Sequence, residues 1–254
     1  ALAVDAGSGQ LVAAWYANSS PGAFVQPLPG GQVTRAPSSG AAGQSQRMGL
    51  SGRLGAPGVY LAYTAGTNPF DGRPALWRVG AAKATVLRVK RGARFTGIAA
   101  APGGRLWLFW AFEDRLFAAR TNAAVTRFGA VVSLKPPKGT DNVWRLAGEA
   151  SLGPLDLLVH LSRTDSDLGS YHQRILPGLS LRGKKGKGKV VLEVSDAGAA
   201  VQGAKVTLSR AGKKAKATTG KSGKLTFTTA TPGRYSAVAT RKGYSKATLK
   251  LKVK

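Results

Sequence analysis

Four short apolar runs recur along the first 160 residues at nearly constant spacing. They read LVAAW at 11–15, VYLAY at 59–63, LWLFW at 106–110 and DLLVH at 156–160. Their last residues, at positions 15, 63, 110 and 160, are spaced by 48, 47 and 50. Each run is too short for a helix and is bounded by turn residues, so each is predicted to be a buried strand. A fixed period of this length indicates one supersecondary unit repeated four times.

The segments around the four runs repeat as well. A glycine-rich turn comes before each run, and a polar loop with a further strand comes after it. Further strands are expected at 24–28, 75–79, 116–120 and 171–176, preceding strands at 3–4, 95–99 and 144–147, and outer strands at 85–89 and 129–134. The five tryptophans all lie in this region, at positions 15, 77, 107, 110 and 144, where core packing is the simplest expectation.

In period and strand content, residues 1–180 resemble the blades of a β-propeller, and they are sialidase-like in broad architecture only. The chain contains no S-x-D-x-G-x-T-W box, no kelch signature and no Trp-Asp dipeptide. The fold class expected is therefore all-β, with about four propeller-like blades followed by a small sandwich. Four blades are few, so a closed ring, an open arc, completion by a second copy and a processed piece of a longer protein all stay open.

The charge of the chain is large and unevenly distributed. The 38 basic and 11 acidic residues give a formal net charge of +27. Residues 1–180 are rich in arginine and carry +10, whereas residues 181–254 are rich in lysine and carry +17. This change of composition predicts three parts, a repeat domain at 1–180, a Lys/Gly linker at 181–189 and a sandwich at 190–254. A positive field of this size attracts polyanions.

The last 65 residues read as a series of short strands separated by glycine turns. Strands are expected at 190–194, 204–209, 215–219, 225–229, 235–240 and 248–254. In the last of them Leu249, Leu251 and Val253 alternate with three lysines, which is typical of a half-buried strand with a basic solvated face.

A longer motif runs through the same region, from Val194 to Tyr244. It reads V-x-D-x-G-x-x-V-x-G-A-x-V-x-L, then T-T-G-x-x-G-x-x-x-F, P-G-x-Y and G-Y. The motif resembles the carboxypeptidase-regulatory-like family of transthyretin- or immunoglobulin-like sandwiches. The resemblance implies an accessory or cell-surface module without a catalytic role.

Inside this motif, AKATTGKS at 215–222 is close to a phosphate-binding loop, G-x-x-x-x-G-K-[ST]. Its first glycine is replaced by Ala215, and a strand rather than a helix is expected to follow. A phosphate loop requires the helix, because the amides of the helix N-terminus bind the phosphate. We therefore interpret 220–223 as a hairpin turn and expect no nucleotide.

No set of residues forms a recognisable catalytic or metal-binding motif. Cysteine is absent, and His160 and His172 lack the spacing of zinc ligands. Asp165 and Asp167 alternate in a loop and are a weak calcium candidate, because further ligands are missing. Glu113, Asp114 and Glu149 are the carboxylates that could form the catalytic pair of a glycosidase, and nothing in the sequence places them together. We expect a protein that is not an enzyme and holds no cofactor.

Two lysine-rich patches are the candidate binding residues, as non-specific contacts for an acidic polysaccharide, an anionic envelope polymer or nucleic acid. They are Lys184, Lys185, Lys187, Lys189, Lys213, Lys214, Lys216 and Lys221. Ala1 is expected to follow a cleavage site, so a secreted or cell-surface protein is expected. The predicted function is non-catalytic binding, with the sandwich anchored to an anionic polymer, an envelope or a neighbouring subunit. The alternatives are a subunit of an extracellular oligomer or filament and a sialidase-like glycosidase fragment.

Overall fold

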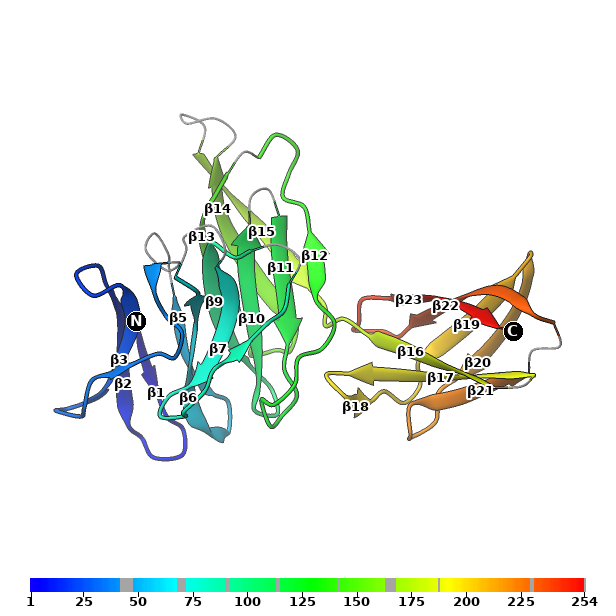
Figure 1. Ribbon diagram of the computed structural model, residues 1–254, viewed down its shortest axis with the longest axis horizontal. Helices are drawn as coiled ribbons and strands as arrows, with labels where there is room; N and C mark the ends of the chain where they lie inside the picture. Colours follow the sequence, from blue (N-terminus) through cyan, green and yellow to red (C-terminus); the bar gives the residue numbers. More distant parts are fainter. Residues whose placement is uncertain are drawn as a thin grey trace. The chain divides into compact units, whose positions relative to one another are not determined.

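The computed structural model is all-β, as expected (Figure 1). It describes residues 1–41, 48–67, 72–89, 92–112, 115–140, 142–162, 168–186, 188–228 and 231–253. Within these ranges no helix is long and apolar enough to cross a membrane. The chain divides into two compact units. The first holds residues 1–118, 123–125 and 133–175, and the second holds residues 119–122, 126–132 and 176–254.

Four sheets follow one another along residues 1–175, each with its strands in chain order. The first sheet contains β1 (Leu2–Val4), β2 (Leu11–Ala17), β3 (Gly22–Leu28) and β4 (Thr34–Arg35). The second contains β5 (Gly49–Arg53), β6 (Ala56–Ala65), β7 (Arg73–Arg78) and β8 (Thr85–Val86). The third contains β9 (Phe95–Ala101), β10 (Arg105–Phe112), β11 (Arg115–Arg120) and β12 (Val132–Leu134). The fourth contains β13 (Asn142–Glu149), β14 (Leu155–Ser162) and β15 (Leu168–Ile175).

Each of the four apolar runs lies in the second strand of its sheet, so the prediction of four strand repeats is confirmed. The runs form strands because branched and aromatic side chains alternate between the two faces of a sheet. Both faces are covered in β6 and β10, and one face is covered in β2 and β14. Two strands were not anticipated, β4 and β5. Both lack an apolar alternation, since β4 has two residues and β5 reads GLSGR.

Neighbouring sheets meet through their first strands, since β1 contacts β5, β5 contacts β9 and β9 contacts β13. A polar contact recurs at the end of the first strand in the first two repeats. The carboxylate of Asp5 accepts a hydrogen bond from the Gly58 amide at 3.0 Å, and Arg53 Nε donates to the Gly104 carbonyl at 2.8 Å. Each contact reaches the turn before the apolar run of the next repeat, so the period in the sequence corresponds to a repeated contact between sheets.

The predicted alignment of the fourth repeat is wrong by one residue. It placed His160 opposite Tyr63 and Trp110, both of which are buried. The structure instead buries Leu157 and Val159 and leaves Leu158 exposed, with His160 half-buried beside it. Because side chains alternate along a strand, a shift of one residue exchanges the two faces. The expected core role also fails for two tryptophans, since Trp15 and Trp144 are 38% and 43% exposed.

The second unit contains two packed sheets. One consists of β16 (Ser180–Gly186), β17 (Lys189–Asp196), β18 (Ala199–Ala200) and β21 (Lys224–Thr228). The other has the strand order β20 (Lys213–Thr218), β19 (Lys205–Arg210), β22 (Gly233–Thr240) and β23 (Ala247–Val253). Both sheets supply buried aliphatic residues to one core, including Val190, Leu192, Val206 and Leu208. The six strands expected in this region are all present.

The linker predicted at 181–189 is replaced by a strand over most of its length. Residues of β16 pair antiparallel with β17, and Lys184 lies opposite Val191. The glycines that suggested a flexible linker have a packing role, because a Cβ on Gly183 would come within 3.0 Å of Leu249 and 3.2 Å of Leu192. The polar composition of this segment did not predict a strand, because the segment becomes a strand by pairing with β17.

The hairpin predicted at 220–223 is also corrected. β20 and β21 lie in different sheets, so the turn carries the chain from one sheet to the other. Gly223 has a φ of +69° and its amide donates to the Gly220 carbonyl at 3.0 Å, as a tight turn requires. The segment after the turn is the strand β21, so AKATTGKS lacks the helix on which a phosphate loop depends.

Candidate functional site

The sheet β20-β19-β22-β23 carries cations on the side opposite to its core. Residues that pair across antiparallel strands point to the same side of a sheet. Arg234 pairs with Lys252, Ser236 pairs with Lys250 and Ser209, and Ser209 pairs with Lys214. The six cations on this side are all exposed, and we call the surface that they form the basic face: Lys205, Lys214, Lys216, Arg234, Lys250 and Lys252.

Alternation along each strand places these cations outward. In β23 the exposed Lys250 and Lys252 alternate with the half-buried Leu249 and Leu251, as the sequence predicted. In β19 the buried Val206 and Leu208 likewise direct their neighbours to solvent. Once the leucines and valines enter the core, the cations in between have no other side to occupy.

Nothing in the four strands neutralises the basic face. None of them contains Asp or Glu, and serine and threonine fill positions between the cations. Strands in a sheet lie about 4.8 Å apart and alternate residues about 6.8 Å apart. These separations are below the Debye length of about 8 Å at physiological ionic strength, so the fields of neighbouring cations add.

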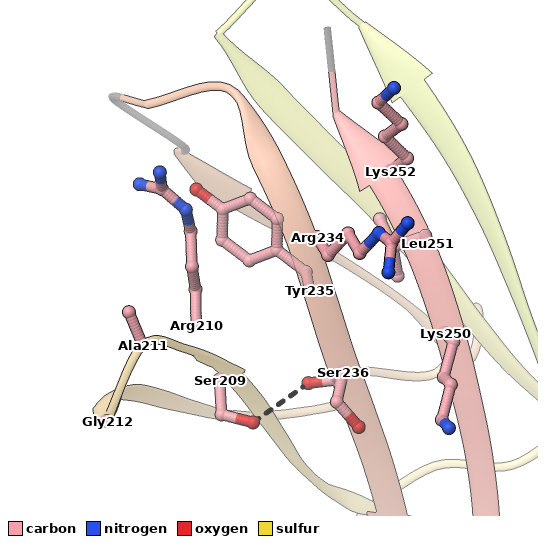
Figure 2. A pocket seen from close by; sticks show the side chains of 10 residues that line it. All are labelled: Ser209, Arg210, Ala211, Gly212, Arg234, Tyr235, Ser236, Lys250, Leu251 and Lys252. Carbon is pink, nitrogen blue, oxygen red and sulfur yellow. Dashed lines mark hydrogen bonds between the residues drawn. The ribbon is translucent and has the colours of Figure 1, made fainter.

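A hollow of about 590 Å³ lies at one end of this sheet, as Figure 2 shows. Its lining comes from β19 and the turn after it, from β22 and from β23: Ser209, Arg210, Ala211, Gly212, Arg234, Tyr235, Ser236, Lys250, Leu251 and Lys252. The Arg210 guanidinium lies 5.7 Å from the centre of the Tyr235 ring, and Ser209 Oγ donates to the Ser236 carbonyl at 3.2 Å. Cations and hydroxyl groups around an open hollow suit an anionic group of an extended ligand.

The predicted lysines do not form one site. Lys214 and Lys216 belong to the basic face, whereas Lys213 alternates to the other side of β20. Lys184 and Lys189 are exposed on the other sheet, and Lys221 is exposed in the turn after β20. Lys187 and the side chain of Lys185 lie outside the described residues.

The sequence analysis missed four members of the basic face, Lys205, Arg234, Lys250 and Lys252. The alternation in the last strand was the available signal for Lys250 and Lys252. Nothing local marked Arg234, because its neighbours across the sheet are far away in the sequence.

The catalytic and metal candidates gain no support. Asp165, Asp167, Glu113 and Asp114 lie outside the described residues. Hydrogen bonds from Ser151 hold the pKa of Glu149 below its ordinary value, which suits a turn carboxylate and not a general acid. In the part of the chain that the structure describes, no three His, Asp or Glu side chains form a group that could hold a metal ion.

The two histidines occupy one side of the fourth sheet. His172 Nε2 lies 3.1 Å from Asp156 Oδ1, and Arg174 Nη1 lies 3.9 Å from the second oxygen of the same carboxylate. This ion-pair cluster is exposed, and its carboxylate is shared between two partners.

Comparisons with known proteins show a family similarity for the C-terminal segment of the chain. No curated protein matches the chain. Two solved structures from B. thetaiotaomicron align with 99% of it, the extracellular domains of a hybrid two-component system (9% identity, TM-score 0.32) and of a one-component system (10% identity, TM-score 0.26). The chain spans only 37% and 44% of their lengths. Residues 187–254 match the family model of the carboxypeptidase regulatory-like domain, which confirms the resemblance of the C-terminal segment to that family.

Proposed function

We propose that the protein is a non-catalytic binding protein of the cell surface or extracellular space, attached to an anionic polymer by the basic face. The observation that carries this proposal is a set of six exposed cations on one side of a sheet whose strands contain no acid. Binding would release counterions from the polymer, which makes affinity fall steeply with salt.

Acidic polysaccharides and anionic envelope polymers are the ligand class that this surface suits best. The residues that pair on the outward side of the sheet are Lys, Arg, Ser, Thr and Val, so this side has no aromatic platform for base stacking. The ring of Tyr235 belongs to the other side and reaches only the lining of the hollow. A polysaccharide can be recognised by the spacing of its anionic groups and by contacts with its hydroxyl groups, without any nucleobase. The hollow beside Arg234 and Lys252 would then receive a carboxylate or sulfate of the polymer.

The four sheets of the first unit would serve as a rigid scaffold on which the basic module is carried. Their chain-order strands and recurring contacts support a propeller-like arrangement. In this role the first unit presents surfaces for further contacts, while the second unit attaches to the polymer.

Heparin affinity of two charge-matched variants tests the proposal. One variant changes Lys214, Lys216, Arg234 and Lys250 to Gln, and the control changes Lys184, Lys189, Lys221 and Lys224 to Gln. Both lower the net charge by four, so net charge alone would weaken binding equally. We expect the first variant to lose at least about tenfold more affinity and to show a shallower dependence on salt. Equal losses in the two variants would contradict a defined site.

A further inference from the structure

The outward side of the first sheet is apolar and exposed. Cross-strand pairing in β1 to β4 places eleven residues on this side, which we call the first-sheet face: Leu2, Val4, Leu11, Ala13, Trp15, Ala17, Gly22, Phe24, Gln26, Leu28 and Arg35. Leu2 and Val4 are 64% and 52% exposed, and the Trp15 and Phe24 rings stack at 6.1 Å. Arg35, in the edge strand β4, is the one charged residue among them, and its guanidinium lies 6.0 Å from the centre of the Phe24 ring.

The first-sheet face corresponds to surfaces that are buried in the next two repeats. Trp15 occupies the position that Tyr63 holds in the second sheet and Trp110 in the third, and both of those are buried. Tyr63 is buried because it packs, with its neighbours in β6, against Val12 and other residues of the first sheet. The first-sheet face therefore has the composition of a surface that receives another sheet.

The outward side of the fourth sheet is a poor partner for it. That side carries Arg145, Glu149, Asp156, His172 and Arg174, with Asp156 paired to His172 and Arg174. Covering these charges with leucine and tryptophan would remove them from water without new partners, which costs several kcal/mol per charge. Head-to-tail stacking of copies, first sheet on fourth sheet, is therefore disfavoured.

We propose that the first-sheet face is a dimer interface, which packs against the same face of a second copy of this chain. Apolar residues then meet apolar residues, and the contact closes on itself as two-fold interfaces do. Two sheets packed face to face lie about 10 Å apart with interdigitating side chains. The stacked rings of Trp15 and Phe24 supply rigid aromatic anchors.

The distribution of charge also favours a second copy of the chain as the partner of the first-sheet face. A face with a single charged residue adds little to the repulsion between two chains that each carry +27. Association of two such copies is opposed by their mutual repulsion, so salt strengthens the dimer. Polymer binding by the basic face changes in the opposite direction, because salt weakens it.

Sedimentation equilibrium of the full chain tests the proposal across a wide range of concentration, in low and high salt. We expect the mass to rise to twice the monomer mass and to stay there, with a tighter dimer at high salt. Leu2→Glu and Trp15→Ser should each weaken the dimer by at least about tenfold. Leu158→Glu is the matched control, because Leu158 is 52% exposed on the outward side of the fourth sheet.

A monomeric mass at all concentrations, or a mass that grows beyond the dimer, would overturn the proposal. The absence of native cysteine allows a second measurement. An Ala13→Cys variant places a thiol at the centre of the first-sheet face and should oxidise to a disulfide-linked dimer, whereas Leu158→Cys should not. Heparin affinity of the same variants stays unchanged if the two sites are independent, so failure of one proposal leaves the other standing.

Discussion

The indole Nε1 of Trp107 donates a hydrogen bond to the carbonyl oxygen of Gly153, across 3.0 Å. Trp107 lies in β10 of the third sheet, and Gly153 lies in the turn before β14 of the fourth. Its acceptor corresponds to Gly104 one repeat earlier, which accepts from Arg53 and also lies in the turn before a second strand; the donor is in a second strand here and in a first strand there. Sheets of this chain are therefore joined by polar contacts to turns as well as by their apolar faces.

Replacing Trp107 with Phe should destabilise the first unit by about 2 kcal/mol. The ring volume falls, and the partly buried carbonyl of Gly153 loses its donor. Urea unfolding followed by tryptophan fluorescence reports on this unit alone, because all five tryptophans belong to it.

Trp144→Phe provides the control for this measurement. Trp144 is partly exposed and donates to Ser162 Oγ at 3.0 Å, so a smaller ring at this position removes less buried surface than at Trp107. We expect a loss below about 1 kcal/mol. Equal losses at the two positions would show that the contact with Gly153 has no particular role in joining the sheets.

Gly148 should not tolerate even a methyl group. A Cβ at this position in β13 would lie 2.6 Å from a ring carbon of Phe109, which is fully buried in β10, and 2.9 Å from Leu155. Gly148→Ala should therefore cost about 1–3 kcal/mol through overpacking. Gly169→Ala is the control, since a Cβ there has no neighbour within 4 Å. Recovery of stability on adding Phe109→Leu would identify the ring as the cause.

Period and alternation in the sequence were enough to locate the strands but not the sides that they bury. The run at 156–160 was found as a strand, yet its register was wrong by one residue, because DLLVH offers apolar side chains on both sides. The glycines at 183 and 186 looked like a linker, since the strand that pairs with them lies after them in the chain. Pairing is a tertiary property, and composition does not encode it locally.

The basic face shows the same limit. Lys214 and Lys216 were nominated from a local cluster, and they do belong to it. Arg234 joins them only because β22 pairs with β19, although β20 and β21 lie between these two strands in the sequence. Charge density in the sequence identified the basic module, and the order of strands identified which of its cations share one surface.

Stability should fall in acid through Asp5. Hydrogen bonds from the amides of Gly58 and Gly7 hold the pKa of this carboxyl below its usual value of 3.8. A lowered folded-state pKa stabilises the fold above the unfolded-state pKa, and this contribution is lost as the pH falls through the folded-state pKa. Unfolding of the first unit should therefore depend on pH below about 4. In Asp5→Asn that part of the dependence should be absent, and an unchanged pH profile would exclude a role for this carboxylate.

Removing a cation from the basic face should stabilise the second unit while it weakens polymer binding. Arg234 and Lys252 lie directly opposite each other on β22 and β23. Like charges in this position repel, so Lys252→Gln should raise the stability of the sheet by about 0.2–1 kcal/mol in low salt and by less in high salt. Hydrogen exchange of amides in β22 and β23 measures this change without interference from the first unit.

Lys246→Gln, outside the four strands, is the control and should leave exchange unaltered. A stable variant with lost heparin affinity would show that the repulsion is retained for binding, whereas faster exchange in Lys252→Gln would mean that Lys252 stabilises the fold.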